Sequence, residues 1–263
     1  MEKIKYFLKF GKSDHLKSLI DGNLYCSNAI TFWGIEDEIK IKGQGDILEA
    51  GARMFAQKMT VFNPETNEAL GEFGQANGLV RIEPAERMPV FCLFAVYEDD
   101  CIEKPNGEII ISLSEEKKKT IRGHFPKADA VVVIPNPRVF IDDVRKSIGT
   151  EIKSESVHYF NIDKGFKTND GQTAMDMEYM RYLMQDVAPV KEKGKITYTF
   201  YADYAYRVLF CKDVFFRNEQ EYRIVLPNDV IDDGRSYPIK LSTEYKIYSL
   251  NDFFAQGSEK EEK

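Results

Sequence analysis

The residues best suited to chemistry lie in one segment near the end of the chain, Phe215 to Pro227, which reads FFRNEQEYRIVLP. Glu219 and Glu221 are two residues apart where a hydrophobic strand is expected to begin, and the pleat of a strand would place both carboxylates on one face. Like charges that close raise each other's pKa unless solvent or a bound cation compensates. The pair could therefore stabilise a developing positive charge, or it could be a solvated strand edge with Arg223 nearby.

The segment resembles the glutamate motif of ADP-ribosyltransferases, in which E-x-E stands at the start of a strand that continues as a hydrophobic stretch. The resemblance implies that Glu221 contacts the nicotinamide ribose of NAD, the substrate, and stabilises the oxocarbenium character that develops as nicotinamide leaves. A fixed anion beside an emerging positive charge acts most strongly in a water-poor cleft. By position, Glu219 would help to present the acceptor, as the first glutamate does in arginine-modifying members.

The first third of the chain is also similar to several compact transferases of that superfamily, which begin with a strand, a helix and a second strand. The resemblance implies that Lys9 on the first strand and Ser27 on the second hold the dinucleotide, and that Phe32 stacks on nicotinamide. The chain departs from the family pattern at two points. Lys9 stands where His or Arg is expected, and Cys26-Ser27-Asn28 replaces a Ser-Thr-Ser triplet.

A second resemblance covers more of the chain. The order of YFLKFG, GNLYCSNAITFW, GDILEAG and FRNEQEYRIVLP is similar to a large family of uncharacterised bacterial and phage proteins with a lYkY strand, a lyfs…F.D..E segment and a final yEkEyRi strand. Members occur near mobile elements and phage-defence genes, which implies a role in phage–host conflict. Asp46 and Glu49 match the acidic part of this pattern, but they also fit the capping of a helix through Ala50 to Gln57.

Two other classes of function stay open. A non-catalytic component of a phage or defence system would recognise a partner protein through an exposed apolar patch. A metal-dependent nuclease would use Glu221-Tyr222-Arg223 as a degraded E-x-K strand, with Asp203 or Asp213 upstream, although the lysine is missing. We expect no metal, because the four cysteines and three histidines are scattered without the short spacings of zinc ligands.

The overall composition limits the partners. The net charge of −7 repels phosphate backbones, so we expect no extended nucleic-acid surface, whereas a single nucleotide ligand is compatible with it. No stretch approaches the 18 apolar residues of a membrane span, and the first residues do not read as a signal peptide. Unpaired, scattered cysteines agree with a reducing compartment, and we therefore expect a cytoplasmic protein.

The elements that must position these residues are strands and helices that do not alternate regularly. This pattern predicts an α+β fold with a mainly antiparallel core and flanking helices, and the resemblance implies the split sheet of ADP-ribosyltransferases. We expect a single domain over residues 1–257 and a disordered charged tail over 258–263. Helices are expected at 13–22, 46–57, 137–149 and 175–186, and strands at 4–10, 24–27, 58–62, 69–73, 78–82, 90–97, 109–113, 130–134, 157–162, 196–201, 206–210 and 222–226.

Overall fold

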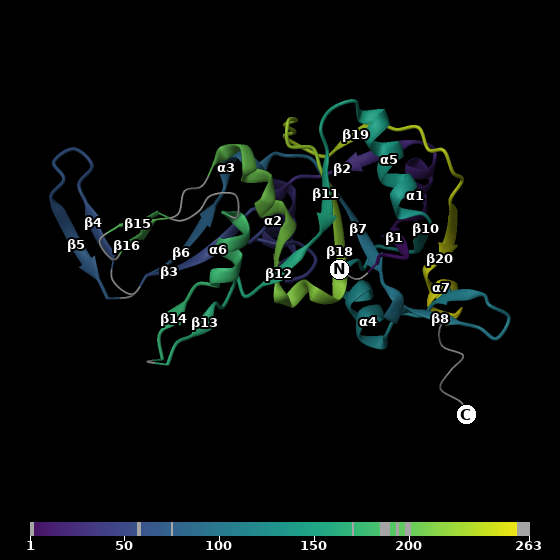
Figure 1. Ribbon diagram of the computed structural model, residues 1–263, viewed down its shortest axis with the longest axis horizontal. Helices are drawn as coiled ribbons and strands as arrows, with labels where there is room; N and C mark the ends of the chain where they lie inside the picture. Colours follow the sequence, from purple (N-terminus) through teal and green to yellow (C-terminus); the bar gives the residue numbers. More distant parts are fainter. Residues whose placement is uncertain are drawn as a thin grey trace. The chain divides into compact units, whose positions relative to one another are not determined.

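The structure is a computed structural model that describes residues 3–56, 59–74, 76–169, 171–184, 190–192, 195–197 and 201–256 (Figure 1). Its internal contacts divide the chain into two compact units. Unit 1 comprises Met1–Ile47, Arg87–Val157 and Phe215–Lys263, and unit 2 comprises Leu48–Glu86 and His158–Val214. The single domain over residues 1–257 stays a prediction, and the tail at 258–263 lies outside the described residues.

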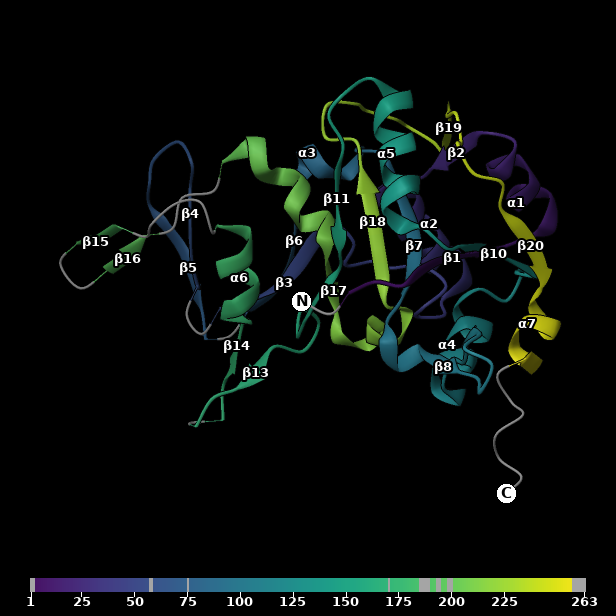
Figure 2. The same ribbon diagram turned by 45° about the vertical axis from the view of Figure 1, so that its right-hand side comes forward.

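Unit 1 is built on a six-stranded sheet in which every neighbouring pair is antiparallel. Figures 1 and 2 both show one of its strands, β18, between β11 and β7. In spatial order the strands are β11 (Lys153–Ser156), β18 (Glu221–Val225), β7 (Val90–Val96), β1 (Tyr6–Gly11), β10 (Ala130–Ile134) and β20 (Lys246–Ser249). The strand that carries Glu221 is therefore an interior strand, hydrogen-bonded on both sides.

Alternating side chains of this sheet form two apolar layers. Phe7 and Leu93 point to one face, which we call face A, where α1 (Ser13–Ile20) and α5 (Pro137–Ile148) add Leu16, Leu19, Phe140 and Val144. Leu8 and Phe94 point to the opposite face, face B, where α4 (Glu115–His124) and α7 (Leu250–Gln256) add Ile121, Phe253 and Phe254. Burial of both faces explains why the interior strands β7 and β10 are nearly continuous apolar runs.

The remaining elements of unit 1 extend this framework. β2 (Asn23–Cys26) pairs with β19 (Arg235–Pro238), and β8 (Cys101–Glu103) forms a hairpin with β9 (Ile109–Ile111). Helix α2 (Ala29–Ile39) begins at Asn28, whose side chain accepts a hydrogen bond from the Thr31 amide, and ends at Lys40 with φ +59°. This is the N-cap geometry expected for asparagine.

Unit 2 consists of small two-stranded sheets and short helices. The antiparallel pairs are β3 (Gly51–Ala56) with β6 (Ala76–Arg81), β4 (Met59–Phe62) with β5 (Ala69–Phe73), β13 (Phe166–Lys167) with β14 (Thr173–Ala174), and β15 (Val190–Glu192) with β16 (Lys195–Thr197). β12 (His158–Phe160) and β17 (Cys211–Asp213) run parallel. The helices are α3 (Glu83–Glu86), α6 (Met177–Leu183) and a 3-10 helix over Ala202–Phe210.

The predicted α+β class and the mainly antiparallel core are confirmed, together with most of the expected elements. Three local predictions are wrong. Gly51–Ala56 is a strand and not part of a helix, because Gly51 lies so close to the Val80 carbonyl that a Cβ would stand 2.5 Å from its oxygen. The run at 206–210 belongs to a 3-10 helix, since a short buried apolar run fits either structure. Glu219 ends a 3-10 helix and is not on the strand that Glu221 opens, so the two do not share one pleat.

Candidate functional site

Glu221 opens β18 and is aimed at face B. It stands opposite Phe94 of β7, and two residues later Arg223 stands opposite Cys92. Because paired residues of antiparallel strands share a face, both Glu221 and Arg223 lie on the side of the sheet that carries Phe94. Tyr222 lies between them and points to face A, where it packs against Phe7 with 4.6 Å between ring centroids.

Glu221 and Arg223 form a two-pronged ion pair. Arg223 donates from Nε and from a terminal nitrogen to the two carboxylate oxygens, each at 3.0 Å. The exposed fraction is 8% for Glu221 and 1% for Arg223. A guanidinium keeps its charge in proteins, so this buried cation holds a carboxylate beside it in one orientation. The site thus contains a fixed anion on a rigid central strand.

The Cys92 thiol lies next to this pair. Its own burial and, second, the charge of Glu221 raise the pKa of Cys92, while Arg223 and Lys9 act in the opposite direction. The thiol is therefore protonated at neutral pH and does not supply a thiolate nucleophile. In this cluster the Glu221 carboxylate is the group that can stabilise a positive charge.

Glu219 is not part of the strand. It ends a 3-10 helix over Val214–Glu219, and Gln220 follows with φ +41°, a left-handed conformation that is uncommon outside glycine. Hydrogen bonds from its backbone and from its side chain hold Gln220 in this conformation. Its carbonyl accepts from the Ala95 amide at 2.8 Å, and its side-chain nitrogen donates to the Ala95 carbonyl at 2.7 Å and to Asp100 Oδ2 at 2.8 Å. The backbone turn at Gln220, and not the pleat, fixes how Glu219 stands relative to Glu221.

Glu219 is paired with a histidine that the sequence did not single out. Its Oε1 lies 2.7 Å from Nδ1 of His124, the last residue of α4, and the exposed fraction of Glu219 is 6%. The His124 ring stacks on Phe215 at 5.5 Å between centroids and meets the edge of Phe216 at 5.9 Å. A carboxylate that orients an imidazole is an arrangement suited to proton transfer.

A glycine-rich turn brings Phe32's helix to this histidine. Gly43 has φ +105° and lies so close to the His124 ring that a Cβ would be 2.4 Å from it. Gly45 lies equally close to the backbone of α2, and the Asp46 amide donates to the Phe32 carbonyl at 3.3 Å. Lys42 places its ammonium 5.0 Å from the centroid of Phe215. The turn therefore links Phe32 to the cluster of His124 and Glu219.

The other predicted NAD contacts stand elsewhere in unit 1. Lys9 is two residues from Phe7 on β1, so both side chains point to face A, the face opposite to Glu221. Its ammonium lies 4.6 Å from the Phe91 ring centroid and donates to the Cys92 carbonyl at 2.7 Å. Ser27 exchanges two backbone hydrogen bonds with Val90, which stands opposite Val225. Val225 is four residues from Glu221 along β18, which is a separation of about 13 Å at the usual rise of a strand.

The acidic residues considered for other roles are held by structural contacts or deeply buried. Asp213 lies in unit 2 and accepts a hydrogen bond from the Asp163 amide at 2.9 Å. Asp46 and Glu49, with exposed fractions of 5% and 1%, do not cap a helix, because the chain enters a strand at Gly51. Within the described ranges no group of three or more His, Cys, Asp and Glu residues is arranged to hold a metal ion.

Comparison of the chain with family models, curated proteins and solved structures gave no match. Among the helices of the described residues, none combines the length and apolar character needed to cross a membrane.

Proposed function

We propose that the chain is an NAD-consuming enzyme of the ADP-ribosyltransferase type, with Glu221 as the carboxylate that stabilises the transition state. The observation that carries the proposal is the fixed, buried position of Glu221 under the fork of Arg223. The fork of Arg223 occupies one acceptor position on each carboxylate oxygen and fixes the orientation of the anion. Preorganised charge of this kind is the largest single contribution in many enzymes.

The proposed reaction needs an anion and a base. The bond between nicotinamide and C1′ of the ribose breaks, its electron pair leaves with nicotinamide, and Glu221 stabilises the positive charge that develops at C1′ and the ring oxygen. The acceptor, or water in its absence, then forms a new bond to C1′ and loses a proton. Glu219 and His124 supply the groups to take up that proton, since the carboxylate orients the imidazole at 2.7 Å.

Ser27, Phe32 and Lys9 stay predicted contacts of the dinucleotide, and the split sheet stays part of the proposal. Phe32 is the best supported of the three, because the turn at Gly43 and Gly45 joins its helix to His124. Lys9 is the least supported, because its side chain points to the face opposite to Glu221 and donates to the Cys92 carbonyl. A role in phage–host conflict rests on the second resemblance alone.

Release of nicotinamide from NAD by the purified full chain tests the proposal, because water can replace an unknown acceptor. Glu221→Asp keeps the charge beside Arg223 but moves it by one methylene, and we expect it to lower the rate by about 10²–10³. Glu221→Gln should remove activity. Glu98→Gln is the matched control, since Glu98 pairs with Lys5 at 3.2 Å on the surface of the same unit.

Circular dichroism must show that each variant is folded at the assay temperature. The proposal is wrong if the wild-type chain neither binds nor cleaves NAD, or if folded Glu221→Asp and Glu221→Gln both retain the wild-type rate.

A second candidate is a non-catalytic protein that binds a partner. It is favoured by the hairpin of β4 and β5 in unit 2, where Val61, Phe62 and Leu70 expose 38%, 52% and 65% of their surface. Exposed apolar side chains of this kind on a two-stranded hairpin would suit contact with a partner protein. A wild-type chain that has no affinity for NAD would favour this candidate.

A further inference from the structure

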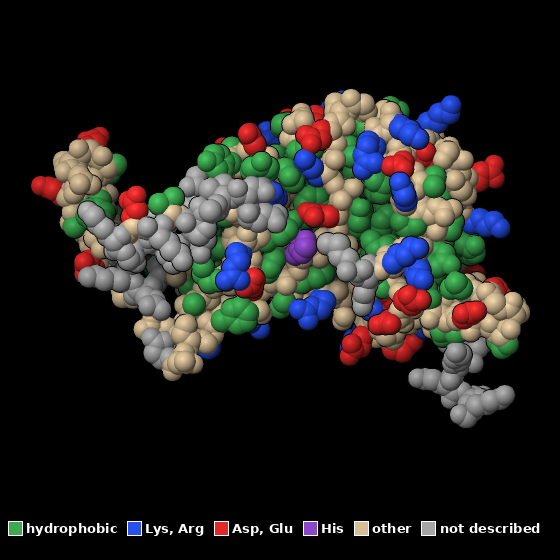
Figure 3. All heavy atoms as spheres, in the orientation of Figure 1, with side chains coloured by type: hydrophobic (Ala, Val, Ile, Leu, Met, Phe, Trp, Pro, Cys, Tyr) green, Lys and Arg blue, Asp and Glu red, His purple; other side chains and the backbone are tan. Residues whose placement is uncertain are grey.

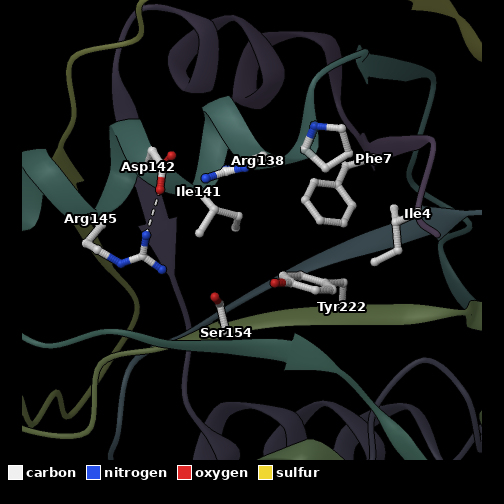
Figure 4. Close-up of a pocket in the computed structure, with 9 residues that line it drawn as sticks. Ile4, Phe7, Arg138, Ile141, Asp142, Arg145, Ser154 and Tyr222 are labelled. Atoms are coloured by element: carbon white, nitrogen blue, oxygen red, sulfur yellow. Dashed lines mark hydrogen bonds and ion pairs between the residues drawn. The ribbon is translucent and has the colours of Figure 1, made fainter. Parts of the chain in front are cut away.

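A pocket on face A of the sheet in unit 1 has no part in the reaction proposed above. It lies beside α5, and Phe7, Arg138, Ile141, Arg145, Ser154 and Tyr222 are among the residues that line it (Figure 4). Its volume of about 390 Å³ is at the lower end of the ~300–1,000 Å³ range of ligand sites. Tyr222 follows Glu221 directly in the chain, but the pleat sends the two side chains to opposite faces.

The inner part of the pocket is apolar and aromatic. The rings of Phe7 and Tyr222 are 4.6 Å apart at an interplanar angle of 42°, and Ile141 faces them from α5, as Figure 4 shows. On the surface, hydrophobic side chains gather beside α5 and are bordered by Lys and Arg side chains (Figure 3). Such walls suit a planar ring, which can stack on aromatic side chains.

The rim of the pocket is cationic. Arg138 is exposed, and its guanidinium forms no ion pair within the described part of the chain. Arg145 is bonded to Asp142 at 2.7 Å, so the two arginines and one aspartate leave one net positive charge. An unpaired guanidinium at the mouth of a pocket is suited to a two-pronged contact with an oxyanion.

Two hydroxyl groups complete the polar part. The Ser154 hydroxyl and the Tyr222 hydroxyl both line the pocket, and burial raises the pKa of Tyr222, so that the phenol keeps its proton. These groups come from the neighbouring strands β11 and β18, while the arginines come from α5. Donors on separate elements around one opening match the several oxygens of a phosphate better than a single point charge.

We propose that this pocket binds a small aromatic phosphate monoester, the class that includes nucleoside monophosphates. The phosphate would contact Arg138 and the hydroxyls at the rim, and the ring would pack between Ile141 and the pair of Phe7 and Tyr222. The volume accommodates one ring and one phosphate, so the pocket is distinct in ligand as well as in position from the proposed NAD site.

Isothermal titration calorimetry of the full chain with phenyl phosphate and with AMP tests the proposal. Adenosine lacks the phosphate and inorganic phosphate lacks the ring, so each should bind at least about tenfold more weakly than the two monoesters. Arg138→Gln should weaken both monoesters by about tenfold or more, because it removes a charge-assisted contact. Lys146→Gln, which removes an exposed cation of α5 that does not line the pocket, should leave binding unchanged.

Further measurements separate this site from the proposed enzyme. The Glu221→Asp variant should bind AMP as tightly as the wild type, even if it no longer cleaves NAD. The side chain of residue 221 lies on face B, whereas the pocket lies on face A. The proposal is overturned if neither monoester binds at millimolar concentration, if Arg138→Gln binds as well as the wild type, or if inorganic phosphate binds as tightly as phenyl phosphate. AMP binding without phenyl phosphate binding would also overturn it, since recognition would then not depend on a generic ring.

Discussion

Arg223 and Glu221, two residues apart on β18, share one face of the sheet and meet through two hydrogen bonds of 3.0 Å. The guanidinium is nearly inaccessible, with 1% of its residue surface exposed. A buried cation of this kind depends on its carboxylate, so the residue proposed to act on NAD also stabilises the fold. Stability and activity at position 221 must therefore be measured separately.

Glu221→Gln should lower the free energy of unfolding by about 3–5 kcal/mol, because an amide nitrogen would then face the donors of the buried Arg223. The double variant Glu221→Gln/Arg223→Met should recover a substantial part of that loss, since it removes the buried guanidinium together with the carboxylate. Urea unfolding followed by circular dichroism measures both values.

The surface pair of Lys5 and Glu98 is the reference for this comparison, because Glu98 exposes 81% of its side chain. Glu98→Gln should cost less than about 1 kcal/mol. An equal cost for the single variants at 98 and 221 would show that Arg223 does not depend on Glu221.

Gln220 provides a second prediction, since it combines φ +41° with side-chain bonds to the Ala95 carbonyl and Asp100. Gln220→Ala loses those bonds and keeps the strained backbone, whereas Gln220→Gly loses the bonds and relieves the strain. The glycine variant should be more stable than the alanine variant by about 1 kcal/mol, the reverse of the usual order. Chemical denaturation of the two variants decides the point, and a more stable alanine variant would contradict the left-handed turn.

Asp129 makes a pH-dependent contribution. Its Oδ1 accepts from the Ser13 amide at 2.7 Å and from the Ser13 hydroxyl at 2.8 Å, and these bonds hold the pKa of Asp129 below its ordinary value of 3.8. In the window from that value down to the folded-state pKa, the unfolded chain binds more protons, so the stabilisation is present above pH 3.8 and is lost as the pH falls.

Asp129→Asn should therefore lower stability at pH 6 and have less effect as the pH falls below 3.8. Ser13→Ala, which removes only the hydroxyl donor, should show part of the same pH dependence. Urea unfolding over this pH range measures the effect. If the free energies of unfolding of the wild type and of Asp129→Asn differ by the same amount at every pH, Asp129 makes no pH-dependent contribution and the prediction is wrong.

The sequence predicts the central strands well and the geometry of the candidate site poorly. The apolar run Ile224-Val225-Leu226 is enough to predict β18, because a strand with both faces covered is rich in apolar residues. The face to which Lys9 points depends on the register of β1, β7 and β18, and pairing between distant segments is not written in local periodicity.

The partners of the two glutamates show the same limit. His124 is 95 residues away from Glu219 in the chain, and no spacing connects them. The left-handed turn at Gln220 has no local signal either, since glutamine is not among the residues that favour positive φ. From the sequence alone, Arg223 is only a charge close to Glu221. Its burial, which makes it the partner of Glu221, is a property of the folded sheet that the local sequence does not show.

The turn that joins α2 to His124 gives a last prediction, based on two glycines in different surroundings. A Cβ at Gly45 would lie 2.4 Å from the Glu36 amide and 2.5 Å from the Phe32 carbonyl, and backbone atoms cannot move away as a side chain can. Gly45→Ala should therefore destabilise the chain by about 1–3 kcal/mol. Gly123 lies in α4 with nothing within 4 Å of its Cβ position, so Gly123→Ala should stabilise by about 0.5–1 kcal/mol. Thermal unfolding of the two variants should shift the melting temperature in opposite directions. A neutral Gly45→Ala would mean that the turn is not packed on α2, and the link between Phe32 and His124 would be lost with it.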